Sequence, residues 1–239
     1  ISSYEKAIQI NPNYVDAHNN LGNVLQELAE YQKAISSYEK AIQINPNYTQ
    51  AYYNLGNVLQ ELGEYQKAIS SYEKAIQIDP NYAQAYYNLG NVLQELGEYQ
   101  KAISSYEKAI QINPNYVDAH NNLGKALIEL KENKKAIISY EKAIQINPNY
   151  AQAYYNLGTI YKELGEYQKA ISFHHMAVKY EPENLAHLYH LSRLDKKILQ
   201  SNLKNKIYEI IEKNNSTKKN IAYGNFLLSR YELKAKKYK

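Results

Sequence analysis

The chain has 239 residues, a formal net charge of +4 and no cysteine, and it contains 27 tyrosines but no tryptophan. The missing cysteine excludes a disulfide framework, a thiolate zinc site and a cysteine nucleophile, and no apolar run approaches the roughly 20 residues of a membrane-spanning helix. This composition fits a reducing compartment, so we expect a cytoplasmic location. Because the chain starts at Ile1 and not at Met, we also expect it to be a piece of a longer protein.

Proline marks an internal repeat along most of the chain. All of the prolines lie 34 residues apart, and the sequence between them nearly repeats. They are Pro12, Pro46, Pro80, Pro114, Pro148 and Pro182. The period divides residues 1–184 into a partial unit, 1–14, and five full units. The full units are 15–48, 49–82, 83–116, 117–150 and 151–184.

Each full unit is expected to form two helices. In the unit 49–82, apolar and small residues at i, i+3, i+4 and i+7 define one helix face before Gly63 and a second before Pro80. Gly63 can cap the first helix at its C-terminus. Pro80 ends the second helix, because proline donates no amide hydrogen bond and disfavours helix in the residue before it.

Residues at fixed places in each unit resemble the signature of the tetratricopeptide repeat family. In the second full unit they are Tyr52, Leu55, Gly56, Leu59, Ala68, Tyr72, Ala75 and Pro80. The resemblance covers residues 1–184 and implies an all-α fold, a right-handed superhelical solenoid of antiparallel helix pairs. It also implies that the first helix of each unit lines the inner, concave wall. Since one hairpin cannot bury its own apolar face, neighbouring hairpins are expected to stack and share a core.

Carboxamide side chains recur on the face of the first helices that lies opposite the core residues. At about 100° per residue, Asn54 and Asn57 both lie on that face, one turn apart. A carboxamide carries a donor and an acceptor, so a row of them can bind the backbone of an extended peptide. The candidate ladder is Asn20, Asn54, Asn88, Asn122 and Asn156, with Asn23, Asn57 and Asn91 one turn later. The alternative is a solvated groove, because near-identical units repeat any surface residue.

Tyrosine and glutamate flank this asparagine ladder. Tyr53, Tyr87 and Tyr155 are candidates for contacts with peptide side chains, or for packing between adjacent first helices. A row of acids could favour a basic peptide or could simply be solvated. This row is Glu27, Glu61, Glu95, Glu129 and Glu163. The ladder resembles the asparagine ladder in the tetratricopeptide superhelix of O-linked N-acetylglucosamine transferases, which implies an extended peptide in the concave groove.

Residues 185–239 are predicted to be a divergent, basic helical continuation of the repeats, with 13 Lys and Arg against 4 Asp and Glu. Helices are expected at 185–198, 203–213 and 221–239, with a polar loop at 214–220. The phrases HLYHLSRL and FLLSRYELKAKKYK resemble the junction between tetratricopeptide repeats and a sulfotransferase domain in bacterial proteins. The alternative function is therefore the substrate-targeting portion of a larger enzyme, a sulfotransferase or a glycosyltransferase, whose catalytic domain lies beyond Lys239.

Within the chain itself we predict no catalytic, cofactor or metal site. Nucleophile-elbow, zinc-protease and phosphate-loop motifs are missing from the sequence. His174, His175, His187 and His190 lack carboxylates in a ligand-like pattern, and the net negative charge of residues 1–184 disfavours nucleic acid. The leading hypothesis is a protein-protein interaction scaffold whose partner is a protein or peptide, with no membrane partner. We also expect self-association through the apolar faces left uncovered at the ends.

Overall fold

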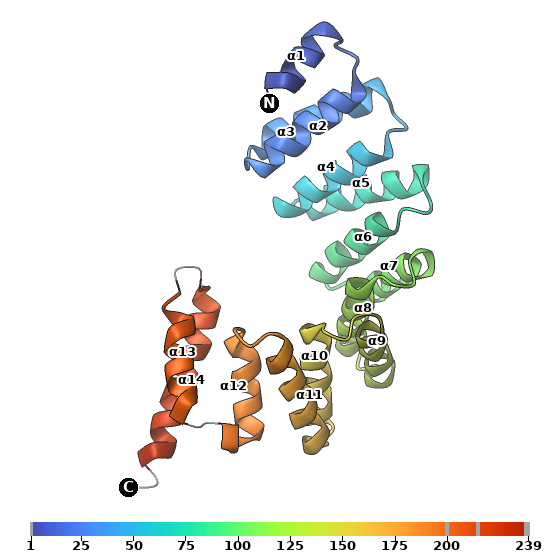
Figure 1. Ribbon diagram of the computed structural model, residues 1–239. Coiled ribbons are helices and arrows are strands. Elements are labelled where there is room, and N and C mark those ends of the chain that lie inside the picture. Colours follow the sequence, from blue (N-terminus) through green and yellow to red (C-terminus); the bar gives the residue numbers. More distant parts are fainter. Residues whose placement is uncertain (1, 199–200, 214–215, 237–239) are drawn as a thin grey trace. The chain divides into compact units, whose positions relative to one another are not determined.

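The computed structural model describes residues 2–198, 201–213 and 216–236, and every regular element in these ranges is a helix (Figure 1). The helices follow one another in consecutive pairs, which confirms the predicted all-α solenoid of helix pairs. The chain divides into two compact units, Ile1–Glu132 and Asn133–Lys239. The repeat bounds and the division at residue 184 stay predictions.

The first unit runs from α1 to α8, and within it α2 pairs with α3, α4 with α5, and α6 with α7. The helices are α1 (Ser2–Ile10), α2 (Val15–Glu27), α3 (Tyr31–Ile44), α4 (Thr49–Glu61), α5 (Tyr65–Ile78), α6 (Ala83–Glu95), α7 (Tyr99–Ile112) and α8 (Val117–Glu129). We call α2, α4, α6, α8, α10 and α12 the first helices of their repeats, and α3, α5, α7, α9, α11 and α13 the second helices.

The second unit runs from α9 to α14. Its elements are α9 (Asn133–Ile146), α10 (Ala151–Glu163), α11 (Tyr167–Tyr180), α12 (Leu185–Leu194), the 3₁₀ turn η1 (Lys196–Ile198), α13 (Ser201–Ile211) and α14 (Lys218–Lys236). Helix α12 ends at Leu194, earlier than expected, because η1 tightens the chain after it. The polar loop expected at 214–220 is shorter than predicted, since α14 begins at Lys218, and its residues 214–215 lie outside the described ranges.

A residue in the left-handed conformation joins α4 to α5. Gly63 has a φ of +73°. Its amide donates to the Gln60 carbonyl over 3.0 Å, and the Glu64 amide donates to the Leu59 carbonyl over 2.8 Å. These two bonds form a Schellman motif, which satisfies carbonyls at the end of α4 that have no partner within the helix. Gly63 therefore caps the first helix, as its position in the sequence indicates.

Two other repeats place a residue with a side chain at this left-handed position. Ala29 has a φ of +57° and Lys131 a φ of +61°, whereas Gly97 and Gly165 hold the position elsewhere. A left-handed conformation costs an L-residue roughly 1–2 kcal/mol. The turns at Ala29 and Lys131 are therefore strained relative to the turns that contain glycine.

The turns after α3, α5, α7 and α9 are each held by a side chain. Helix α5 ends at Ile78, and Asp79 follows with an extended backbone. The Asn81 amide donates to Asp79 Oδ1 over 3.0 Å, and the Tyr82 amide donates to the Asp79 carbonyl over 3.2 Å. Pro80 has no amide hydrogen, and neither of these two hydrogen bonds requires one from it. The turn therefore ends α5 and starts α6 without an unpaired backbone group at these positions.

The centre of each helix pair is an aromatic ring packed against a glycine. Tyr72 of α5 is fully buried, and a Cβ atom added to Gly56 of α4 would lie 2.6 Å from its ring. The Tyr72 hydroxyl donates to Asn57 Oδ1 over 2.8 Å and to Gln60 Oε1 over 2.9 Å. Equivalent pairs are Gly22 with Tyr38 and Gly90 with Tyr106. The ring thus fills the space of a missing side chain, and its buried hydroxyl keeps hydrogen-bond partners.

The repeat period continues further along the chain than the sequence indicates. Helices α12, α13 and α14 share a core of buried residues, to which α14 contributes Leu227 and Leu228. Asn220 Oδ1 accepts a hydrogen bond from the Leu185 amide over 2.8 Å, and Asn220 Nδ2 donates to the Glu183 carbonyl over 2.9 Å. Because Tyr189 and Tyr223 are 34 residues apart and their rings lie 5.3 Å apart, α14 takes the place of a first helix beside α12.

Candidate functional site

Asn54, in the middle of the predicted ladder, is buried between successive first helices. Its Nδ2 atom donates to Asn19 Oδ1 over 3.0 Å and to Asn23 Oδ1 over 2.9 Å, both on α2. Its Oδ1 atom accepts from Gln50 Nε2 over 2.9 Å. Both amide hydrogens are therefore used within the protein. With 7% of its surface exposed, Asn54 joins α4 to α2.

Asn88 on α6 and Asn122 on α8, the next two first helices, repeat this arrangement. Asn88 Nδ2 donates to Asn57 Oδ1 over 2.8 Å and to the Tyr53 hydroxyl over 3.2 Å. Asn122 Nδ2 donates to Asn91 Oδ1 over 2.9 Å and to the Tyr87 hydroxyl over 3.1 Å. The peptide-binding role predicted for this row is therefore revised, because its amide donors already link neighbouring first helices.

The second row of the ladder, Asn23, Asn57 and Asn91, is held through its amide oxygens. Asn57 Oδ1 accepts from both Tyr72 and Asn88, which turns the Nδ2 group away from these contacts. Asn23 and Asn91 are held in the same way, by Tyr38 and Tyr106 and by the following row. Within the described ranges no residue accepts from the Nδ2 groups of Asn23 and Asn57, whereas Asn91 also forms a side-chain hydrogen bond with Tyr87, which lowers the pKa of Tyr87. All three side chains are half-buried and fixed in orientation.

The tyrosines that flank the ladder pack inside the array. The Tyr53 ring lies 4.9 Å from that of Tyr82 and 6.1 Å from that of Tyr72. Tyr87 is placed in the same way, 4.8 Å from Tyr116, and burial raises its pKa above the ordinary value. Their hydroxyls accept from the ladder asparagines. These contacts support the packing interpretation for Tyr53 and Tyr87.

The remaining predicted residues lie at the ends of the ladder. Asn20 Oδ1 accepts from Asn19 Nδ2 over 3.4 Å. In the second unit, Asn156 Oδ1 accepts from Gln152 Nε2 over 3.1 Å, and the Tyr155 hydroxyl lies 3.1 Å from His190 Nε2. The structure thus joins the N-terminal members in pairs of successive first helices, from α2 to α8, and places Asn156 and Tyr155 in a separate compact unit.

A cavity of about 470 Å³ opens beside the second row of asparagines. It is lined by Gln26, Asn57, Gln60, Glu61, Tyr65, Asn88 and Glu95. Glu61 accepts a hydrogen bond from Gln26 Nε2 over 2.9 Å. Glu64, in contrast, forms an ion pair with Lys67 on the neighbouring second helix. The cavity therefore combines a free amide donor of Asn57 with carboxylates that no lysine or arginine of the described residues neutralises.

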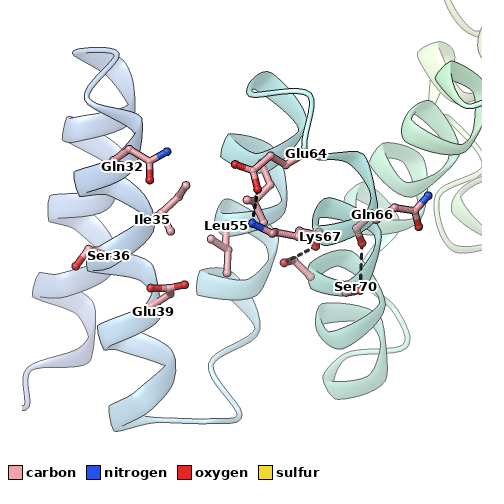
Figure 2. A pocket seen from close by; sticks show the side chains of 11 residues that line it. Gln32, Ile35, Ser36, Glu39, Leu55, Glu64, Gln66, Lys67 and Ser70 are labelled. Atoms are coloured by element: carbon pink, nitrogen blue, oxygen red, sulfur yellow. Dashed lines mark hydrogen bonds and ion pairs between the residues drawn. The ribbon is translucent and has the colours of Figure 1, made fainter.

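A larger cavity, of about 750 Å³, lies between two second helices (Figure 2). Helix α3 contributes Ile35, Ser36 and Glu39, and α5 contributes Lys67 and Ser70. Leu55 and Leu59 of α4 also line it. This cavity lies away from the first-helix face on which the candidate site was predicted. The signal that could have found it is the serine at one slot of the second helices, small and exposed in both Ser36 and Ser70.

Neither a metal-binding cluster nor a membrane-spanning helix occurs among the described residues. Among residues 2–198, 201–213 and 216–236 there is no group of three or more His, Cys, Asp or Glu side chains placed to hold a metal ion. None of the helices in the described part of the chain has the length and apolar character needed to cross a lipid bilayer.

Comparisons with known proteins agree with the repeat. Family models described as tetratricopeptide repeat match residues 14–81, 47–115, 93–138 and 151–184, and one described as TPR repeat matches 124–165. These matches run from residue 14 to residue 184, well over half of the chain. The curated proteins contain no match.

Several solved structures resemble the chain. MamA is 31% identical, with a TM-score of 0.65 over 68% of this chain and 95% of that one. YrrB, described as a TPR protein with an unusual peptide-binding site, is 26% identical, with a TM-score of 0.65 over 78% and 96%. PilF of Pseudomonas aeruginosa shares the fold at 23% identity, with a TM-score of 0.70 over 93% and 97%. With a 34-residue period, paired helices and these matches together, the chain belongs to the tetratricopeptide repeat family.

Proposed function

We propose that this chain is a protein-interaction module that binds an extended peptide along the exposed face of α2, α4 and α6. The observation that carries the proposal is the second asparagine row. Asn23 and Asn57 each present an Nδ2 group that the protein leaves unused while it fixes the oxygen of the same side chain, and the oxygen of Asn91 is fixed in the same way. A peptide backbone offers one carbonyl acceptor per residue, so a regularly spaced row of donors suits it.

Preorganisation supports this choice over the first asparagine row. A side chain that must be ordered on binding costs about 0.5–1.5 kcal/mol, but the hydroxyl of Tyr72 and the amide of Asn88 already hold Asn57 in place. Asn54, in contrast, would have to break bonds to α2 before it could bind a ligand. The peptide-binding site described for YrrB shows that a related fold can carry this function.

The acids of the same face indicate the charge of the peptide. Glu61 and Glu95 line the cavity beside Asn57, and the described lysines of the first unit form their ion pairs on the second helices, with Glu30, Glu64 and Glu98. A lysine or arginine of the ligand would supply the missing positive charge. Such exposed charges act mainly on the association rate, and their effect falls with ionic strength.

The test removes the amide donors of the second asparagine row and keeps the side-chain oxygens that accept hydrogen bonds from the protein. In the triple variant Asn23→Asp, Asn57→Asp and Asn91→Asp, each side chain keeps the oxygen that Tyr38, Tyr72 and Tyr106 bond. The probe is a pool of uncharged peptides of about ten residues that carry a neutral fluorophore, chosen so that the added carboxylates neither attract nor repel it. At roughly 1 kcal/mol for each lost hydrogen bond, we expect fluorescence anisotropy to show binding weakened tenfold to hundredfold.

A charge-matched control distinguishes the loss of the donor row from a general effect of added negative charge. The variant Gln43→Glu, Gln77→Glu and Gln111→Glu adds the same charge at exposed positions of α3, α5 and α7, and it should bind the probe as the parent chain does. Equal affinity of the Asp variant and the parent chain would refute the donor row. The alternative, a targeting portion of a larger enzyme, stays a prediction that the reading frame after Lys239 can test.

A further inference from the structure

The hydrogen-bonded network of the first unit has a counterpart in the second unit that is built from histidine. His190 occupies the ladder slot of Asn88 and Asn122, and its Nε2 atom lies 3.1 Å from the Tyr155 hydroxyl. The two residues are 35 positions apart, as are Asn88 and Tyr53 in the equivalent bond. An amide that cannot titrate is thus replaced by an imidazole that can.

The buried tyrosine of the network is replaced in the repeat that precedes His190. His174 of α11 takes the slot of Tyr72, and a Cβ atom added to Gly158 would lie 2.8 Å from its ring. The side chain is 1% exposed, and its Nδ1 atom has no partner among the described residues. Two adjacent repeats therefore carry histidine at the positions that tyrosine and asparagine hold in the first unit.

These two histidines form a cluster with His187 around Tyr155. The Tyr155 ring centroid lies 5.5 Å from that of His174, 5.1 Å from that of His187 and 5.2 Å from that of His190. The His174 and His190 rings are stacked, 6.2 Å apart. His187 is 2% exposed and its Nδ1 atom also lacks a partner among the described residues. The cluster therefore joins α10 and α11 to α12 through rings that can each take up a proton.

The surroundings of the cluster oppose protonation. Lys162 of α10 and Arg193 of α12 lower the pKa of His190, after the larger effect of burial. Exposed His175 of α11 and Lys162 act on His174 in the same direction, and Tyr223 of α14 is a neutral neighbour whose ring lies 6.1 Å from His190.

The acid in contact with the cluster is Glu181, whose Oε2 atom lies 2.9 Å from His187 Nε2. It raises the pKa of His187, but burial has the larger, opposite effect. A proton on His174 or His190 gains no such partner. Protonation of the docked cluster is therefore unfavourable.

We propose that this histidine cluster makes the docking of α12 and α14 on the α10–α11 pair sensitive to pH, so that the segment is held near neutral pH and released in mild acid. The neutral rings fit the cluster, and the protonated rings are repelled from it and from each other. Once α12 separates, the histidines are hydrated and take up protons freely. Acid therefore favours the separated state.

The direction and size of the effect follow from proton linkage. Burial, followed by the neighbouring histidines and Lys162, lowers the pKa of His174 from 6.5 to about 4. A group whose pKa is lowered on docking contributes its full stability above the undocked value and loses it as the pH falls toward the docked value. For His174 alone, the docking equilibrium constant should fall about thirtyfold between roughly pH 7.5 and pH 5.

The experiment compares hydrogen exchange in α12 with exchange in α4 of the same chain at about pH 7.5 and pH 5, corrected for intrinsic rates. We expect the protection of α12 to fall at least tenfold more than that of α4. The double variant His174→Tyr and His190→Asn, which restores the residues of the first unit, should abolish the difference. Ser172→Asn, at an exposed position of α11, should leave it unchanged.

Two results would overturn the proposal. One is a parent chain in which α12 and α4 respond equally to pH. The other is a double variant that folds and still shows the difference. If the double variant does not fold, NMR titration of the histidine Cε1–H signals in the parent chain decides. Titration of His174 at an ordinary histidine pKa would then refute the proposal, and titration well below that value would support it.

Discussion

Substituting glycine for Ala29 should stabilise the protein, although glycine normally weakens a fold. Ala29 has a φ of +57° in the turn between α2 and α3, where its amide donates to the Gln26 carbonyl over 2.9 Å. The Glu30 amide donates to the Leu25 carbonyl over 2.8 Å. These bonds match those around Gly63, so the backbone is the same and the Cβ atom is the difference. Ala29→Gly should therefore remove strain and keep every hydrogen bond.

The expected change in the free energy of unfolding is the difference between two opposing effects. The left-handed conformation costs alanine roughly 1–2 kcal/mol, and the greater freedom of glycine in the unfolded chain costs about 0.4–1 kcal/mol. The net gain is about 0.5–1 kcal/mol in the free energy of unfolding. Gly63→Ala should lose a similar amount for conformational reasons alone, since no atom lies within 4 Å of an added Cβ.

Chemical denaturation followed by circular dichroism at 222 nm measures the difference. The control is Ala222→Gly, the same substitution at an exposed position inside α14, which should cost about 1 kcal/mol. A second stabilising site is Lys131, with a φ of +61°, and Ala29→Gly with Lys131→Gly should add to within about 0.5 kcal/mol. If Ala29→Gly proves as destabilising as Ala222→Gly, the assigned backbone strain is wrong.

Two other predictions concern the aromatic core and alkaline pH. Gly56→Ala should destabilise the protein by about 1–3 kcal/mol, because the added Cβ would meet the buried Tyr72 ring at 2.6 Å. Urea denaturation measures this loss of stability. A variant as stable as the parent chain would contradict the packing of Gly56 against Tyr72. Burial raises the pKa of Tyr82 from 10.0 to about 12. Its contribution to stability is therefore complete below pH 10 and is lost as the pH rises through 12. Absorbance at 295 nm and circular dichroism, recorded together, should show ionisation of such buried tyrosines coinciding with loss of helix, and a native chain with ionised tyrosines would refute the assignment.

The helices could be predicted because each has a local cause. Gly63 ends α4 by adopting a left-handed conformation, and Asp79 and Pro80 end α5 with a turn. The 34-residue spacing then places equivalent helices along residues 15–184. The turns at Ala29 and Lys131 show the limit of this reasoning, since neither residue favours a left-handed conformation and the bonds of the surrounding turn impose it.

The candidate site could be predicted only as a face of the helices. Helical periodicity places Asn54 and Asn57 on one side, but it does not say which of them meets the preceding helix. That depends on how closely the first helices approach. In the structure the distance allows Asn54 to reach Asn19 and Asn23, which buries Asn54 and occupies its amide donors. A helical continuation of the repeats over residues 185–239 was expected, but the place of α14 as a first helix beside α12 was not, because no proline or left-handed glycine marks that repeat.

The bonds between first helices have a consequence for the length of the array. Each bond joins residues 31 or 35 positions apart, so it involves only two adjacent repeats. If residues 49–82 were excised, Asn88 would face Asn19 and Asn23, the pair that Asn54 contacts in the intact chain. Tyr48 would then take the place of Tyr82, and it already has its own partner, Asp16. Whole repeats could therefore be lost or duplicated without leaving a buried amide unmatched, which makes the gene free to vary in repeat number while the fold of the remaining hairpins is preserved.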